Sequence, residues 1–181
     1  MATLTSTAVD RFDLRFDHRV DALRGNPAMD RLFYTASFLA DHGALWIALA
    51  IVRFFTGIGG AEAAHFAGIR AVCAEWGQAV FINLGVKSLF RRQRPVIAEP
   101  RPFYLRTPRT TSFPSGHSTA SFTAAVLLSQ GTGWAWFLFP LAAIVSFSRI
   151  YVRIHHASDV IGGVAVGLAI GVAVAHFAPL P

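Results

Sequence analysis

The chain has 181 residues, of which 54% are hydrophobic and only 14% are charged, and its mean hydropathy is +0.47. A soluble domain typically carries about 25% charged residues, so this composition predicts one membrane-embedded domain over residues 1–181. The net charge of +6 favours an anionic lipid or phosphate as partner, because no nucleic-acid-binding motif accompanies the arginines. The single Cys73 excludes an internal disulfide.

The first 31 residues are polar, and aspartates are interleaved with arginines from Asp10 to Asp30. No apolar segment follows these charges directly, so no cleavable signal peptide is expected. Residues 1–31 are instead predicted to lie at the membrane interface.

The first apolar run begins near Leu32 and ends near Phe55, but Asp41-His42-Gly43 interrupts it. A charge at mid-bilayer costs roughly 2.5–3.5 kcal/mol on insertion scales, which favours a break at this point. We therefore predict an interfacial segment up to Ala40, then a spanning helix from Gly43 with Asp41 as its N-cap. The alternative is one continuous tilted helix with Asp41 facing the other helices.

Four further apolar runs predict helices, with a basic, proline-rich loop at 91–113 and a glycine turn at 131–133. The runs cover residues 71–90, 118–130, 134–152 and 160–177. Pro140 is expected to kink the third of these runs. The polar residues of the first, Glu75, Gln78 and Asn83, should face other helices rather than lipid.

In the last run, Gly163, Gly167 and Gly171 recur at four-residue spacing, which is typical of close helix packing. Together the runs predict an all-α integral membrane bundle of about five to six helices. The loops that follow and precede these helices bring three polar motifs to one membrane face. An odd number of spans would leave the N-terminus on that face and the C-terminus on the other.

The last of the three motifs, at residues 148–159, contains His155 and Asp159. Their four-residue spacing places them on one face at the start of a helix. A carboxylate bonded to one imidazole nitrogen fixes the tautomer and leaves the other nitrogen free to attack. The alternative is that Asp159 caps the helix and His155 lies at headgroup level. His156 lacks this spacing and is predicted to be a bystander.

The second motif is Pro114-Ser115-Gly116-His117, at the start of a predicted helix. Backbone N–H groups at a helix N-terminus bind anions, and a glycine allows close approach. A histidine in this first turn is placed to protonate a leaving oxygen. An ordinary helix start is the competing interpretation.

Lys87, Arg94 and Arg149 add three cations, which suit the charge that spreads over a transferring phosphoryl group. The other arginines of the polar face are predicted to serve structural or lipid-headgroup roles. They are Arg91, Arg92, Arg101, Arg106, Arg109 and Arg153.

In chain order the motifs read K-x6-R-P from Lys87, P-S-G-H from Pro114, and S-R-x5-H-x3-D from Ser148. This pattern resembles the type 2 phosphatidic acid phosphatase (PAP2) family, the lipid phosphate phosphatases that share their core with vanadium haloperoxidases. The resemblance implies a helical-bundle phosphatase that needs no metal or other cofactor and acts on a lipid phosphate within the bilayer.

The resemblance also implies a role for each matching residue. His155 would be the nucleophile that forms a phosphohistidine, Asp159 would orient it, and His117 would act as general acid and later as base. The residues implied to bind phosphate are Lys87, Arg94, Ser115, Gly116 and Arg149.

The favoured substrate is a polyprenyl phosphate or diphosphate, with phosphatidylglycerophosphate, phosphatidic acid and a polyprenyl-linked sugar phosphate as alternatives. A vanadate-dependent haloperoxidase and an inactive membrane scaffold are more remote. The excess of arginine at the motif face predicts a cytoplasmic active site in the cell membrane, although the family often places its site on the outer face. The oligomeric state and the role of Asp41-His42-Gly43 stay open at this stage.

Overall fold

A computed structural model describes residues 7–90, 92–95 and 110–181, and within them the chain is helical with no strand. The longer helices are α1 (Ala8–Asp21), α2 (Pro27–Leu39), α3 (Ala44–Thr56), α4 (Ala61–Val80), α6 (Gly116–Ser129), α7 (Ala135–Tyr151) and α8 (Ala157–Phe177). A short 3-10 turn, η1 (Asp41–Gly43), joins α2 to α3. A π-helical segment, η2 (Phe81–Val86), continues α4 into α5 (Lys87–Leu89). The predicted all-α fold is confirmed.

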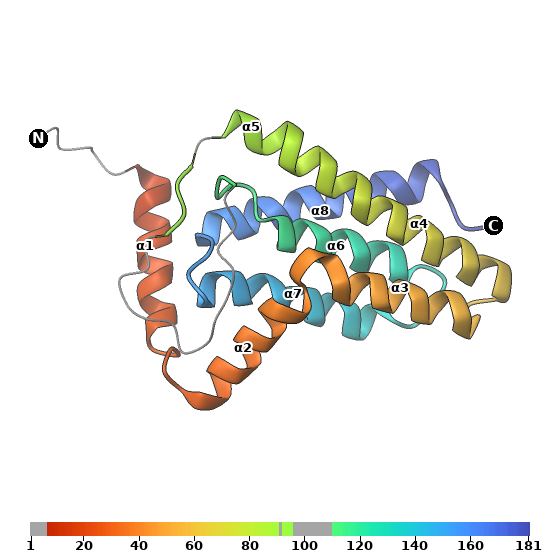
Figure 1. Cartoon of the computed structure of the whole chain (residues 1–181), viewed down its shortest axis with the longest axis horizontal. Helices are drawn as coiled ribbons and strands as arrows, with labels where there is room; N and C mark the ends of the chain where they lie inside the picture. The colour runs from red at the N-terminus through yellow and green to blue at the C-terminus, as the bar shows by residue number, and fades with distance from the viewer. Residues whose placement is uncertain (1–6, 91, 96–109) are drawn as a thin grey trace, which may run out of the picture.

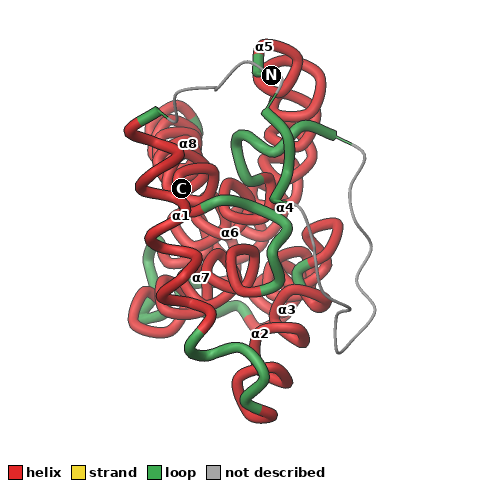
Figure 2. Tube along the Cα trace, turned by 90° about the vertical axis from the view of Figure 1, so that its left-hand side faces the viewer, coloured by secondary structure: helices red, strands yellow, loops and turns green. Residues whose placement is uncertain are grey.

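Helices α3, α4, α6, α7 and α8 run along the long axis of the molecule, and α1 lies across one end of them (Figure 1). The C-terminus lies at the end of the bundle opposite to α1. Viewed from the α1 end, α1 crosses in front of α7 and α8 (Figure 2). The helix α1 was not predicted, because its charges gave no sustained apolar pattern.

The break at Asp41 is confirmed, since α2 and the following helix meet at an angle of 57°, which excludes one continuous helix. The prediction that Asp41 caps α3 is wrong. His42 and Gly43 both adopt left-handed backbone, with φ of 54° and 75°, and they turn the chain so that Gly43 precedes α3 without a side-chain cap. Asp41 instead accepts a hydrogen bond of 3.2 Å from the backbone N–H of His42.

The predicted glycine stripe of α8 packs directly against α6. A Cβ atom on Gly163 would lie 2.6 Å from the Ser115 carbonyl oxygen, and one on Gly167 would lie 2.5 Å from that of Thr119. Such separations are below van der Waals contact, so larger side chains would force the helices apart. The glycines thus allow α8 to hold the α6 N-terminus in place beside the site.

The polar residues predicted to face other helices from the 71–90 run differ in burial. Glu75 and Gln78 are buried, as predicted, whereas Asn83 is exposed. Asn83 lies in the π-helical segment, and its side chain accepts a hydrogen bond from Lys87 rather than contacting a neighbouring helix. A π-helical turn often occurs at a functional site, and this one directly precedes Lys87.

Two buried arginines bind backbone carbonyls at the end opposite to α1. Arg53 donates to the carbonyls of Leu128 and Gln130, and Arg70 donates to those of Leu127 and Ala178. The last carbonyl groups of a helix lack hydrogen-bond donors within the helix. These guanidinium groups supply the missing donors at the C-terminus of α6.

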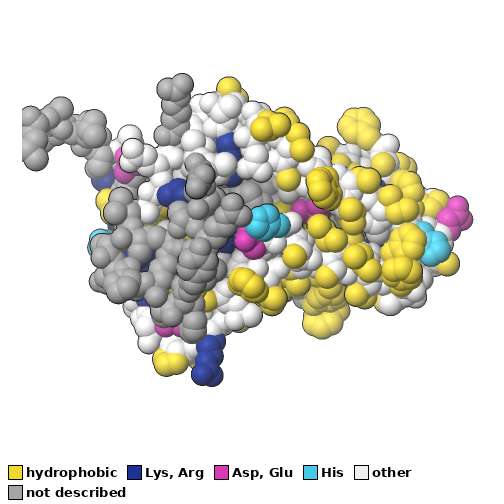
Figure 3. All heavy atoms as spheres, in the orientation of Figure 1, with side chains coloured by type: hydrophobic (Ala, Val, Ile, Leu, Met, Phe, Trp, Pro, Cys, Tyr) yellow, Lys and Arg dark blue, Asp and Glu magenta, His cyan; other side chains and the backbone are white. Residues whose placement is uncertain are grey.

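Helix α8 has 21 residues and a mean hydropathy of 2.2, and among the described residues it is the one helix long and apolar enough to cross a membrane. At 1.5 Å per residue it spans about 30 Å, the thickness of a bilayer core. The bent pair of α2 with residues 41–56 passes the same test if it counts as one span. Hydrophobic side chains gather over the part of the surface away from α1, whereas most of the visible lysines and arginines lie towards the α1 end (Figure 3).

Candidate active site

A cavity of about 630 Å³ opens between α4, η1 and the N-terminus of α6, near the end that α1 crosses. Its polar wall holds Lys87, Arg94, Gly116, His117, Arg149 and His155. Much of the remaining wall is apolar and includes Ile47, Ala79 and Ile82. Trp76, which is 69% exposed, also lines it and connects the cavity with the apolar outer surface of α4. The structure thus brings six of the eight predicted site residues to one cavity.

His155 is held in the short segment between α7 and α8 and is 3% exposed. Its Nε2 atom lies 3.2 Å from a guanidinium nitrogen of Arg94, on the cavity side. Its Nδ1 atom lies 3.7 Å from Asp159 Oδ2, close to hydrogen-bonding distance. Burial, together with the charges of Arg149 and Arg94, lowers the pKa of the His155 imidazole to about 3 despite the nearby carboxylate. The imidazole is therefore neutral at physiological pH, the state a nucleophile requires.

Asp159 lies behind the cavity and is fully buried in the first turn of α8. Its Oδ2 atom accepts hydrogen bonds from the backbone N–H of His156, at 2.9 Å, and from the Ser112 hydroxyl. Its Oδ1 atom accepts from Arg92 at 2.7 Å. Asp159 therefore both caps α8 and faces His155, so the two interpretations of this residue are compatible. His156 is the N-cap residue of the helix.

His117 lies in the first turn of α6 and lines the cavity. Its Nε2 atom is buried without a hydrogen-bond partner in the described part of the chain, and Asp41 Oδ1 lies 3.8 Å from it. The backbone N–H groups in the first turn of a helix have no partner within it, so those of Gly116 and His117 are available to an anion.

Ser115 does not line the cavity. It is the N-cap residue of α6, and its hydroxyl oxygen accepts a 3.4 Å hydrogen bond from the backbone N–H of Ser118. Its own backbone N–H donates to the Asp159 carbonyl oxygen at 3.0 Å. In this structure Ser115 therefore ties the starts of α6 and α8 together, and a phosphate contact from it stays a prediction.

The three cations are fixed by hydrogen bonds from different parts of the chain. The Lys87 ammonium donates to the side chains of Asn83, at 3.0 Å, and Thr110, at 3.2 Å. Arg94 donates to the carbonyl oxygens of Thr110 and Ile154, each at 3.0 Å. Arg149 donates to the Ser37 hydroxyl from α2. Three positive side chains in fixed positions around one space suit the binding of a phosphate group.

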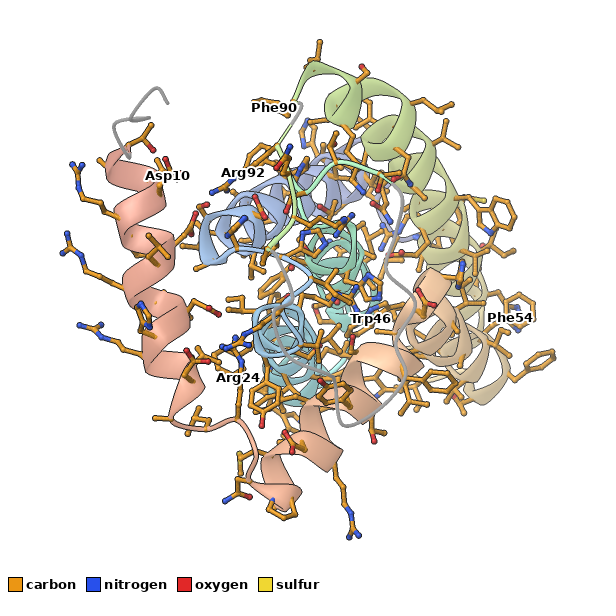
Figure 4. The ribbon with its side chains drawn as sticks, turned by 60° about the vertical axis from the view of Figure 1, so that its left-hand side comes forward. Asp10, Arg24, Trp46, Phe54, Phe90 and Arg92 are labelled. Atoms are coloured by element: carbon orange, nitrogen blue, oxygen red, sulfur yellow. The ribbon has the colours of Figure 1, made fainter. Side chains whose placement is uncertain are left out.

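Several supporting residues were not predicted, and they come from distant parts of the chain. Arg92 donates to Asp13 of α1 and to Asp159, so it acts inside the molecule rather than at a lipid headgroup (Figure 4). Asp13 also accepts from the backbone N–H of Ser158 at 2.8 Å. No local motif marks Asp13, because it is one of several aspartates in an Arg-rich segment.

Arginine pairs also dock α1 at its other end. Arg24 donates to Asp21 and Asp17 and to the carbonyl oxygens of Ile150 and Tyr151, and Arg153 donates to Asp21. The remaining arginines predicted to have structural or lipid-headgroup roles lie outside the described residues; they are Arg91, Arg101, Arg106 and Arg109.

A helical bundle with histidines and cations around one cavity at the N-terminus of α6 has the charges that suit a phosphate, and comparison with known proteins identifies the family of the chain. The PAP2 superfamily family model matches residues 68–180. A decaprenylphosphoryl-5-phosphoribose phosphatase from Mycolicibacterium smegmatis is 32% identical over 146 residues, covering 78% of this chain and 75% of that protein. This chain belongs to the PAP2 superfamily.

A decaprenylphosphoryl-5-phosphoribose phosphatase from Mycobacterium tuberculosis is 39% identical over 93 residues, so the match spans about half of each protein, 48% in both cases. Among solved structures, a transmembrane PAP2-type phosphatidylglycerolphosphate phosphatase from Bacillus subtilis superposes with a TM-score of 0.72. That likeness covers 96% of this chain and 88% of the other at 21% identity, and it shows a shared fold.

Proposed function

We propose that the chain is a membrane-bound lipid phosphatase that acts through a phosphohistidine on His155. The observation that carries the proposal is the cavity itself. Two histidines and three cations line one part of it, while apolar residues line much of the rest and reach the exposed Trp76. A phosphate would bind at the cations while the lipid chain leaves along the apolar wall into the bilayer.

In the proposed first step the neutral Nε2 of His155 attacks phosphorus, so that a P–N bond forms as the bond to the leaving oxygen breaks. His117 donates a proton to that oxygen. The bound phosphate supplies the negative charge that favours protonated His117 before this transfer. The three cations stabilise the charge on the non-bridging oxygens.

In the second step water attacks the phosphohistidine, and His117 accepts its proton. The P–N bond breaks, inorganic phosphate leaves, and both histidines return to their starting states. Asp159 would stabilise His155 throughout, and Arg92 would hold Asp159 in place. The proposed substrates are polyprenyl phosphates or diphosphates. Phosphatidylglycerophosphate, phosphatidic acid and polyprenyl-linked sugar phosphates are the alternatives, and the names of the mycobacterial relatives support the last of these.

The proposal is tested by phosphate release from purified protein in detergent across those lipids. We expect release that persists in a chelator and is inhibited by vanadate, a phosphate analogue that the three cations would hold. Absence of release from every lipid, or release that requires an added divalent metal, would contradict the proposal.

A further inference from the structure

Two polar side chains of α4 line the same cavity as His117 and His155 and have no role in the chemistry described above. Glu75 and Gln78 are 5% and 6% exposed. Gln78 Nε2 donates to Glu75 Oε2 at 3.2 Å. The other oxygens, Glu75 Oε1 and Gln78 Oε1, are buried without a hydrogen-bond partner among the described residues. Buried polar atoms are rarely left unpaired, so this pair points to a ligand.

The position of the pair along α4 indicates which part of a substrate it would meet. Asn83 accepts a hydrogen bond from the Lys87 ammonium and therefore marks the phosphate end of the cavity. Gln78 precedes Asn83 by five residues and Glu75 precedes it by eight, which is about 7 Å and about 12 Å along a helix. That depth lies beyond the phosphate group, where the first atoms of the leaving alcohol would lie.

The charges at this depth differ from those at the phosphate end. Lys87, Arg94 and Arg149 are the lysine and arginines among the described lining residues, and they belong to the polar wall that also holds His117 and His155. The wall around Glu75 offers acceptors, and Gly43 of η1 is its neighbour, since a Cβ on Gly43 would lie 3.6 Å from Glu75 Oε2. A second phosphate group would meet a carboxyl group and an amide oxygen there. A hydroxyl group both donates and accepts, so it suits the carboxyl group in either protonation state.

We propose that Glu75 and Gln78 form a hydroxyl-recognition subsite, so that the preferred substrate is a phosphomonoester of a sugar or polyol carried on a lipid. This inference rests on the proposed phosphatase function, and among the substrates named there it selects those with a hydroxylated leaving group over polyprenyl phosphates and diphosphates. The substrate hydroxyls donate to Glu75 Oε1 and Gln78 Oε1 and satisfy both oxygens. A leaving group without hydroxyls leaves these oxygens unpaired, and a site of this kind rejects such analogues.

The test uses two synthetic substrates, a lipid-linked pentose 5-phosphate and its 2,3-dideoxy analogue, which differ only in two hydroxyl groups. We expect the wild-type protein to prefer the hydroxylated substrate by about tenfold or more in kcat/KM. In Glu75→Leu and in Gln78→Leu this ratio should fall towards one. Glu75→Gln, which keeps an acceptor oxygen, should retain part of the preference.

Glu62→Leu is the matched control, because it removes an exposed carboxylate from the same helix outside the cavity, and it should keep the wild-type ratio. A wild-type ratio near one, or a ratio unchanged in both leucine variants, overturns the subsite while leaving the phosphatase proposal intact. Absence of vanadate-sensitive release from either substrate and from all other lipid phosphates overturns both. If Glu75→Leu fails to fold in a thermal unfolding assay, the ratio in Gln78→Leu decides.

Discussion

The imidazole of His155 lies between a guanidinium group on its Nε2 side and a carboxylate on its Nδ1 side. This arrangement turns one nitrogen towards Arg94 and the other towards Asp159. The attack proposed for His155 would therefore come from Nε2, since Nδ1 faces Asp159. The geometry therefore assigns a direction to a residue that the motif alone identifies only by type.

The depressed pKa of His155 predicts how its reactivity depends on pH. An ordinary histidine becomes protonated as the pH falls through about 6.5, whereas His155 stays neutral until the pH approaches its folded value of about 3. Diethyl pyrocarbonate modifies neutral imidazole, so we expect phosphate-protectable inactivation by this reagent to follow no ionisation near pH 6.5. A rate that halves at pH 6.5 would contradict the burial argument. Wild-type protein incubated without reagent at each pH is the control.

Substitution of His117 should affect substrates unequally. Because His117 is proposed to protonate the leaving oxygen, His117→Ala should slow the release of a lipid alcohol by about 10²–10⁴-fold. An activated aryl phosphate, whose leaving group needs no proton, should suffer far less. Phosphate release from the two substrate types measures this difference, and equal losses on both would rule out the general-acid role.

At the scale of elements, the close contact of α6 with α8 keeps their N-terminal turns side by side. These turns carry His117 and Asp159. The stripe of glycines makes this contact possible, and Ser115 ties the helix starts together through the Asp159 carbonyl. Overpacking at such a contact costs typically 1–3 kcal/mol.

Gly167→Ala should therefore lower the midpoint of thermal unfolding in detergent, since its Cβ would lie 2.5 Å from the Thr119 carbonyl oxygen. Gly77→Ala, near the C-terminal end of α4, is the matched control, because no described residue packs within 4 Å of the added carbon from outside that part of the helix. Replacing a helix-interior glycine with alanine at a tolerant site stabilises by roughly 0.5–1 kcal/mol, so the control should unfold at the same or a higher temperature. Equal destabilisation in both variants would show that the stripe does not determine the contact.

Most of these elements could be predicted because apolar runs and helix breakers are local signals. The starts of α6 and α8 follow from Pro114 and from Asp159, and the bend follows from the charge at Asp41. The docking of α1 could not be predicted in this way. It depends on ion pairs such as Asp13 with Arg92, which join residues 79 positions apart and resemble ordinary surface charges in the sequence.

The same distinction between local and long-range signals applies to the residues of the site. Its reacting residues could be identified because they form compact motifs, whereas the residues that support them do not. Ser112 and Arg92, which contact Asp159, and Ser37, which contacts Arg149, become neighbours of the site only when the helices pack. The sequence predicts Asp41 only as a helix cap, whereas in the structure it lies in η1 and lines the cavity beside His117.

At the scale of the whole molecule, the α1 end carries the proposed active site and the opposite end carries the buried pair Arg53 and Arg70. Three of the arginines behind the cytoplasmic prediction, Arg24, Arg92 and Arg153, pair with aspartates in the structure, although acidic residues weigh little in the positive-inside rule. The cytoplasmic orientation nevertheless stays our proposal, since the exposed Arg11, Arg15 and Arg19 lie on the same end.

Cysteine labelling tests this orientation. In a Cys73→Ser background, Arg15→Cys places a thiol at the α1 end and Glu62→Cys places one at the opposite end, each on an exposed position. With an impermeant thiol reagent outside intact cells, we expect labelling at residue 62 and protection at residue 15 until the cells are opened. The reverse pattern would place the active site on the outer face.

The central claim, that this fold transfers phosphate through His155, is tested most directly by acid quenching of the purified protein during turnover of a phosphate-labelled lipid. We expect labelled phosphohistidine in the wild-type protein, in the presence of a chelator, and neither phosphoenzyme nor phosphate release in His155→Ala. A folded His155→Ala variant that turns over at a near-normal rate would contradict the account.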